Sequence, residues 1–213
     1  MTGMLYGTTT SPHRFAAKNL SIFLRAISAI GIALAVSGCG VNTIPTLEEQ
    51  AKSAWSQVQN QYQRRAELIP NLVETVKGFA KQEREVLTQV IEARAKATQI
   101  QVNANQLTDP EAIRRFQEAQ QQLSGALGRL IAVSENYPEL KSNQNFLALQ
   151  SQLEGTENRI AVARRDYIGA VRDFNTEIRT FPGMIWARLF WGAKPMAEFA
   201  ATAGSETAPT VKF

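Results

Sequence analysis

The fold is decided by residues 51–100, whose sequence is AKSAWSQVQNQYQRRAELIPNLVETVKGFAKQEREVLTQVIEARAKATQI. Apolar side chains recur here at steps that alternate between four and three residues, from Ala51 to Ile100, and only Arg65 and Glu83 interrupt the apolar series. This heptad pattern is typical of a helix that packs along another helix. The stretch therefore predicts one long helix as the first element of an all-α fold.

Pro70 lies inside this pattern and predicts a local disturbance of the helix. Proline has no backbone N–H, and its ring clashes with the carbonyl one turn earlier, so the helix should be kinked or broken near Leu68–Ile69. The apolar series keeps its phase across Pro70, which favours a kink over a change of direction. A kink leaves a carbonyl unpaired one turn before the proline, and Arg64, Arg65 or Asn71 could satisfy it.

A second helix is marked by its own start and stop signals. Thr108 or Asp109 can cap it, and Pro110 suits its first position. Its apolar series runs from Ile113 to Tyr137, and Pro138 ends it. We therefore expect a helix over this range, separate from the first.

A third long helix and a short fourth one follow. Ser142 or Asn143 can cap the third, whose apolar side chains run from Phe146 to Phe181 before Pro182-Gly183 stops it. Three long helices joined by short loops must pack antiparallel. We predict an elongated all-α bundle of three long helices over residues 46–191, the first kinked or broken at Pro70, plus a short C-terminal helix. Residues 192–213 are predicted to be a loose tail.

The segment before the bundle carries the features of an export signal. Arg14, Lys18 and Arg25 precede an apolar run, Ala26–Val36, and small residues lead from it to Cys39. The sequence Val-Ser-Gly-Cys at 36–39 resembles the lipobox of a bacterial lipoprotein, in which the chain is cut before the cysteine and the cysteine carries lipid. We expect a signal peptide over residues 1–38, and a lipidated Cys39 with a linker over residues 39–45.

A retained membrane helix is the alternative to cleavage. The uncharged run from Ala26 to Gly38 has 13 residues, fewer than the ~20 that a helix needs to span a bilayer. Both interpretations place the bulk of the chain outside the cytoplasm. We expect it on the outer side of the cytoplasmic membrane or on the outer membrane, and Gly40 in place of an aspartate favours the latter.

Composition and charge exclude several classes of function. Three of the 23 basic residues precede Cys39, so the remaining 20 nearly balance 19 acidic residues, and we expect no nucleic-acid partner. Cys39 and His13 are the only residues of their types. A chain cut before Cys39 has no imidazole and no free thiol, which excludes Ser-His-Asp and Cys-His sets and His-ligated metals. We predict no metal, no cofactor and no enzymatic activity, with Glu83 as the best remaining catalytic carboxylate.

Two polar clusters are candidate sites. Arg64, Arg65 and Asn71 lie beside the predicted bend, where they either satisfy freed carbonyls or bind a carboxylate or phosphate of a partner. Glu157 lies in a dense polar stretch of the third helix, and we predict a buried polar pair between Arg65 and Glu157.

The short apolar stretch near the C-terminus also has two interpretations. Ile185, Trp186, Leu189, Phe190 and Trp191 could cap the open end of the bundle, or lie at a membrane interface, where tryptophan is favoured. We favour capping.

Five blocks of this sequence resemble the LemA family. They are AWSQVQNQYQRRAELIPNLVETVKGFA (54–80), KQEREVLTQVIEARAKA (81–97), LSGALGRLIAVSENYPELKSNQNFLALQSQLEGTENRIAVARRDY (123–167), DFNTEIRTFPG (173–183) and APTVKF (208–213). Two positions depart from the family: Cys39 replaces an uncleaved membrane helix, and Ile168-Gly169 stands where an asparagine and a polar residue are expected. The resemblance implies an α-helical, membrane-attached protein without established activity, cofactor or catalytic residues.

Two functions remain open at this point. The leading hypothesis is a membrane-anchored envelope protein, bound to membrane lipid through Cys39, that acts as a scaffold or interaction module for another membrane protein. Its long helical surfaces suit helix-in-groove contacts, and the resemblance suggests membrane proteases or quality-control proteins as neighbours. The alternative is a binding module that holds an anionic envelope ligand at Arg64 and Arg65.

Overall fold

The computed structural model describes residues 27–28 and 42–200. The chain divides into two units, Met1–Thr43 and Ile44–Phe213. In the first unit, Ile27 and Ser28 are helical and exposed. The expected signal peptide and the lipidation site at Cys39 lie outside the described residues, so the fold and the sites below belong to the second unit.

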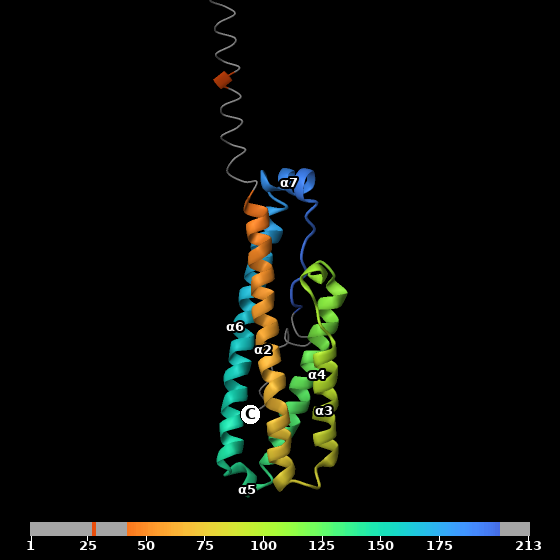
Figure 1. The fold of residues 1–213 in the computed structure, drawn as a ribbon, viewed down its shortest axis with the longest axis vertical. Helices are drawn as coiled ribbons and strands as arrows, with labels where there is room; N and C mark the ends of the chain where they lie inside the picture. Colours follow the sequence, from red (N-terminus) through yellow and green to blue (C-terminus); the bar gives the residue numbers. More distant parts are fainter. Residues whose placement is uncertain (1–26, 29–41, 201–213) are drawn as a thin grey trace, which may run out of the picture. The chain divides into compact units, whose positions relative to one another are not determined.

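Four principal helices form an antiparallel bundle (Figure 1). They are α2 (Thr43–Phe79), α3 (Arg84–Gln99), α4 (Pro110–Ser134) and α6 (Gln144–Glu177). Figure 1 shows α2 beside α6, and α3 beside α4. The described residues contain no strand, which confirms the all-α class. Since α3 has 16 residues against 37 for α2 and 34 for α6, it accompanies those helices over only part of their length.

The prediction of three long helices was wrong, because the first predicted helix is two. Helix α2 runs unbroken through Pro70, ends at Phe79, and gives way to a turn before α3. In that turn Ala80 is fully buried and its carbonyl accepts the N–H of Glu83 at 3.1 Å. Periodicity could not show the reversal, because both helices face one core in the same phase. Folding back buries apolar side chains of α3 that a projecting helix would leave in water: Leu87, Val90 and Ala97.

The predicted starts of α4 and α6 are confirmed. The Asp109 carboxylate accepts the backbone N–H of Glu111 at 2.9 Å, and Pro110 is the first residue of α4. The Asn143 side chain accepts the backbone N–H of Phe146 at 3.1 Å and caps α6. Each cap satisfies a donor that a helix N-terminus leaves free.

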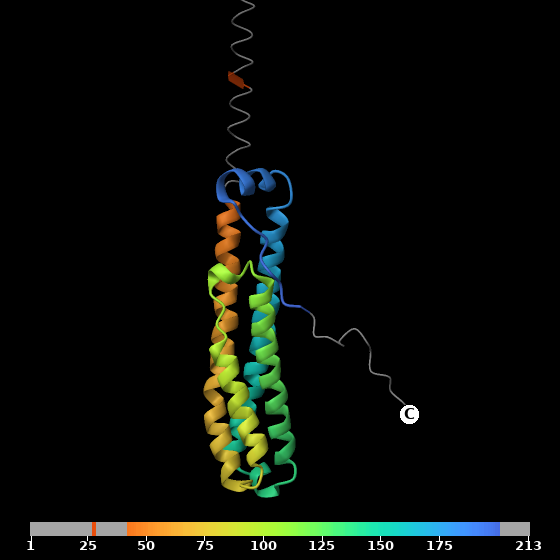
Figure 2. The ribbon, with the colours of Figure 1, turned by 90° about the vertical axis from the view of Figure 1, so that its right-hand side faces the viewer.

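Short elements close both ends of the bundle. Helix α5 (Pro138–Lys141) lies between α4 and α6, and η1 (Ala104–Gln106) lies between α3 and α4. Helix α7 (Gly183–Trp186) and the π-helical turn η2 (Ala187–Trp191) lie at the end of the bundle where α2 begins, as Figures 1 and 2 both show.

Residues 192–200 were predicted to belong to a loose tail, yet they pack on the bundle. They have no helix, and both Met196 and Phe199 are buried. The composition of the segment suggested a loose tail, but α3 leaves one side of α2 and α6 uncovered. The two apolar side chains fill that space, which explains why the segment is held there.

The core has two clusters. The aromatic core surrounds Trp55, and its members include Ile44, Trp55, Tyr62, Leu107, Ile113, Phe116, Tyr167, Phe174 and Phe199. The aliphatic core lies among all four helices, and its members include Ile69, Leu72, Val76, Leu87, Leu123, Leu127, Leu130, Leu140, Phe146 and Leu153. Arg65 belongs to neither cluster.

Candidate functional site

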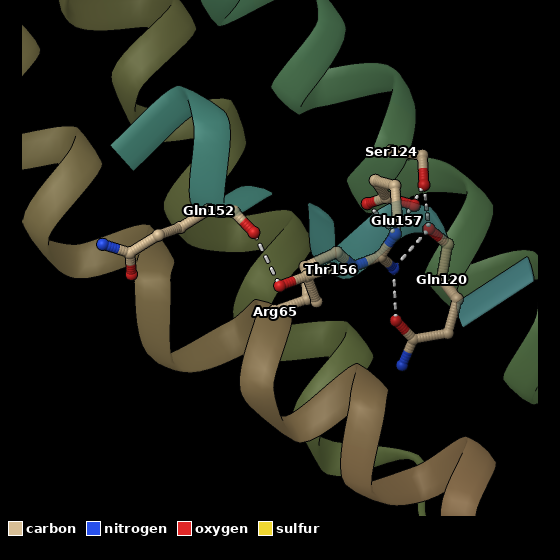
Figure 3. A network of polar contacts seen from close by, with 6 residues as sticks. All are labelled: Arg65, Gln120, Ser124, Gln152, Thr156 and Glu157. Carbon is tan, nitrogen blue, oxygen red and sulfur yellow. Dashed lines mark hydrogen bonds and ion pairs between the residues drawn. The ribbon is translucent and has the colours of Figure 1, made fainter. Parts of the chain in front are cut away.

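Arg65 is the centre of a buried polar network (Figure 3). Its side chain is 1% exposed and lies among α2, α4 and α6. One terminal nitrogen, Nη1, donates to Ser124 Oγ at 2.8 Å and to Glu157 Oε1 at 2.9 Å. The other, Nη2, donates to the carbonyl and side-chain oxygens of Gln120 at 3.1 and 2.6 Å. One guanidinium therefore joins three helices through four hydrogen bonds.

Gln120 extends this network to the remaining helix. Its amide nitrogen donates to the carbonyl of Ala97, the residue near the end of α3, at 3.2 Å. The Arg65 network thus touches all four principal helices. Such a layer fixes the register of helices against one another more than it stabilises them, because removing the charges from water is costly.

The surroundings of Arg65 also affect Tyr62. The Arg65 guanidinium carbon lies 4.9 Å from the centre of the Tyr62 ring, within the range of a cation–π contact. Burial raises the pKa of Tyr62 above its usual value, and the nearby Arg164 and Arg65 only partly oppose this effect. The Tyr62 phenol therefore stays neutral to a higher pH than a tyrosine in water.

The structure brings together one of the two predicted sets of residues and not the other. Arg65 and Glu157 form an ion pair, in which the Glu157 side chain is 42% exposed. Arg64 is exposed and pairs with Glu67 on its own helix at 3.6 Å, and Asn71 is exposed. Because Arg65 points inward, Arg64, Arg65 and Asn71 do not form one exposed site for an anion.

The carbonyl that Pro70 leaves free is satisfied by a residue that sequence reasoning missed. Arg94 of α3 donates from Nε to the carbonyl of Ala66, one turn before Pro70, at 2.8 Å. No local signal pointed to Arg94, since it approaches α2 only because the chain reverses between α2 and α3. Once the reversal is known, the signal is an arginine on the neighbouring helix that faces the carbonyl one turn before a proline. Such an arginine is predicted to donate a hydrogen bond to that carbonyl.

Side-chain amides hold the segment 193–200 by its backbone. Asn175 accepts the N–H and donates to the carbonyl of Met196, at 2.8 and 2.9 Å. Gln117 makes the same pair of bonds to Ala200, at 3.2 and 2.7 Å. The Tyr167 hydroxyl donates to the carbonyl of Ala197 at 2.9 Å. The sequence analysis did not single out these residues.

A shallow groove runs between α2 and α6 on the outside of the bundle. It has a volume of about 370 Å³ and is lined by Ala54, Gln57, Gln61, Asn158, Arg159, Val162, Ala163 and Asp166. Val162 is 46% exposed at this groove. Short apolar side chains with amides beside them allow another helix to approach closely.

Only part of the apolar stretch at the C-terminal end packs on the bundle. Ala187 is buried in the aromatic core and Trp186 packs against it, so this part caps the bundle. Leu189, Phe190 and Trp191 are exposed.

The structure also bears on the catalytic carboxylate, the metal sites and the membrane helices considered in the sequence analysis. Glu83 lies half-buried in the turn before α3 and accepts the Tyr137 hydroxyl at 3.0 Å, at the end of the bundle. Among residues 27–28 and 42–200, no group of three or more His, Cys, Asp or Glu residues is placed to hold a metal. Within those same ranges, no helix combines the length and the apolar character that crossing a bilayer requires.

Comparisons with known proteins agree with the resemblance found in the sequence and confirm it. Magnetosome protein MamQ 2 of Paramagnetospirillum magneticum is 28% identical over 157 residues, which are 66% of this chain and 58% of the relative. Protein LemA of Metamycoplasma hominis is 26% identical over 155 residues, 73% of this chain and 67% of the relative. Magnetosome protein MamQ of Magnetospirillum gryphiswaldense is 25% identical over 196 residues, 84% of this chain and 72% of the relative. The model of the LemA family matches residues 54–213, which begin about a third of the way along α2, and the chain therefore belongs to the LemA family.

Proposed function

We propose that this protein is a lipid-anchored helical scaffold of the cell envelope that binds a helix of another membrane protein and catalyses no reaction. The observation that carries the proposal is the groove between α2 and α6, with its apolar floor at Ala54, Val162 and Ala163. The Arg65 network supports it, because a bundle whose four helices are held in register presents a groove of constant shape.

Anchoring rests on the sequence around Cys39. The order of basic residues, apolar run and small residues before Cys39 is typical of an exported lipoprotein, and two or more acyl chains hold a protein stably on a membrane. The protein is then on the outer side of the cytoplasmic membrane or on the outer membrane. A Cys39→Ser variant should lose metabolic labelling with palmitate. Absence of palmitate labelling from the parent chain would favour an uncleaved N-terminal helix.

The alternative site for an anionic envelope ligand receives no support from the geometry. Arg65 is already bonded to four oxygen atoms. Arg64, which is exposed, pairs with Glu67. An isolated guanidinium on a helix surface does not build a phosphate or carboxylate site of the kind that two convergent arginines would.

Photocrosslinking from the groove tests the scaffold hypothesis. A photoreactive amino acid would replace Val162 in the full chain in living cells, with Leu147 as the matched control. Both residues are apolar, lie on α6, and have similar exposures of 46% and 48%, but only Val162 lines the groove. We expect one membrane-protein adduct from position 162 and none from position 147.

A second variant shows whether the groove itself is responsible. Ala54→Trp places a large ring on the groove floor and should remove the adduct formed at position 162. Adducts of equal yield from both probe positions, or adducts that persist in the Ala54→Trp background, would contradict a helix bound in the groove.

A further inference from the structure

The end of the bundle at α7 and η2 exposes an apolar surface, which we call the aromatic edge. It consists of Phe181, Ile185, Leu189, Phe190 and Trp191, and these are half of the ten large apolar side chains that are exposed among the described residues. Three of them are more than half exposed, with values of 76% for Phe181, 72% for Leu189 and 65% for Phe190. A cluster of this kind on a folded protein marks a contact surface.

Cations predominate in the sequence around the aromatic edge, although the Glu177 carboxylate lies against Gly183, the first residue of α7. Arg179, Arg188 and Lys194 flank it and are exposed, and no acidic residue occurs between Ile178 and Ala197. None of the three cations pairs with an acidic side chain in the described part of the chain. Apolar rings with unpaired cations beside them fit an anionic lipid surface, where rings lie at headgroup level and cations contact phosphates.

The position of the aromatic edge in the bundle points the same way. Both views place α7 and η2 at the end where α2 begins (Figures 1 and 2). Cys39 precedes the first residue of α2, Thr43, by four positions. Four residues span at most about 14 Å when fully extended. A chain that is anchored by lipid at Cys39 therefore keeps this end of the bundle near the membrane.

We infer that the aromatic edge rests on the anionic lipid surface of the membrane that anchors the chain. The inference depends on the proposed anchoring and adds a second contact, which would hold the bundle upright on the membrane and orient the groove between α2 and α6. A lipid surface accounts for the rings, the unpaired cations and the location at this end. A second protein copy would account for the rings alone.

Quenching by lipid tests this contact. Two variants of the full chain, Phe190→Cys and Leu147→Cys, are labelled with the same thiol-reactive fluorophore. Both positions are exposed and apolar, and only Phe190 belongs to the aromatic edge. Each labelled protein is reconstituted in vesicles of phosphatidylcholine and phosphatidylglycerol whose acyl chains carry bromine, a contact quencher. Any label on Cys39 contributes equally to both samples.

The expected result is at least about twofold stronger quenching at position 190 than at position 147, and a decrease when phosphatidylglycerol is omitted. Leu189→Asp, which changes an exposed side chain, should lower quenching at position 190 without affecting the fold. Sedimentation with the vesicles reports anchoring separately. If both labelled proteins sediment and are quenched equally, the lipid contact is refuted while anchoring stands. Energy transfer between copies labelled at position 190, without lipid quenching, would also refute it and assign the surface to self-association.

Discussion

The two halves of the bundle are packed by different means. In the aromatic core, Trp55 contacts Phe116, Tyr167 and Phe199 with ring centroids 5.2, 5.1 and 5.8 Å apart. In the aliphatic core, leucine, valine and alanine side chains from four regular helices fill the same role. The aromatic half is enclosed partly by a loop and by the segment 193–200. Large rings seal irregular backbone where no fourth helix is present, while small branched side chains suffice where helices interdigitate.

The largest expected effect comes from removing the centre of the aromatic half. Trp55 is 1% exposed, and its indole N–H donates to the carbonyl of Val102 at 2.8 Å. Trp55→Ala should lower the free energy of unfolding by about 4 kcal/mol and free the segment 193–200 to proteolysis. Leu130→Ala in the aliphatic half should cost about 3 kcal/mol and leave that segment protected. Chemical unfolding and limited proteolysis of both variants check this. Equal protection of the segment in the two variants would remove the distinction between the halves.

The next effect tests the polar layer at Arg65. Glu157→Gln removes the negative partner of a buried guanidinium, and we expect a loss of about 2 kcal/mol, less than for a fully buried pair because Glu157 is half exposed. Glu154→Gln changes an exposed carboxylate one turn earlier on α6 and should stay within about 0.5 kcal/mol of the parent. Denaturant titration of both variants measures the difference. A similar cost for the two would show that the ion pair adds nothing.

A smaller effect is expected from the hydrogen bond that joins α3 to α2 one turn before Pro70. Arg94→Met keeps much of the side-chain volume but leaves the carbonyl of Ala66 without its donor, which should cost about 1.5 kcal/mol. Pro70→Ala restores the N–H that this carbonyl lacks. In the Pro70→Ala background, Arg94→Met should therefore cost much less. A double-mutant cycle by chemical unfolding measures the coupling, and equal costs in both backgrounds would exclude the proposed pairing.

The smallest effect concerns pH and distinguishes two tyrosines of the aromatic half. Burial raises the pKa of Tyr62 and of Tyr167. Each phenol then keeps its proton in the folded state at a pH where the unfolded chain, with a pKa of about 10, loses it. Their contribution to stability is complete below about pH 10 and is lost as the pH rises further towards the folded pKa.

Two substitutions separate these contributions. Tyr62→Phe and Tyr167→Phe should both make the alkaline loss of stability less steep. Tyr167→Phe should also cost about 1 kcal/mol at neutral pH, because it removes the hydrogen bond to Ala197. Unfolding free energies measured from pH 8 to pH 11 test both expectations. An unchanged slope in either variant would show that the phenol is not shielded from water.

The sequence predicted those parts of the fold that depend on local chemistry. Asp109 and Asn143 were recognisable as caps because a side-chain acceptor at a helix start satisfies nearby N–H groups. The turn between α2 and α3 was not recognisable, because it contains no proline and its apolar series stays in phase. The number of helices therefore could not be predicted from local signals. It depends on which helices pack against one another, and that is a property of the tertiary structure.

The site shows the same division. Arg65 was notable because it interrupts an apolar series, a pattern that indicates a polar group facing a core. Arg94 and the amides of Gln117 and Asn175 form hydrogen bonds with backbone atoms of distant segments. Because every residue has these backbone atoms, the pattern of side chains in the sequence does not indicate such contacts. Such contacts become visible only when the chain path is known.

The way the segment 193–200 is held has a consequence for how the protein can evolve. Asn175 and Gln117 bond to backbone groups of Met196 and Ala200, and every residue type except proline offers the same donor and acceptor. Substitutions at exposed positions of the segment should therefore accumulate freely, while those two amides and the buried Phe199 should vary little among descendants of this chain. Selection would act here on the residues that hold the segment more than on the segment itself.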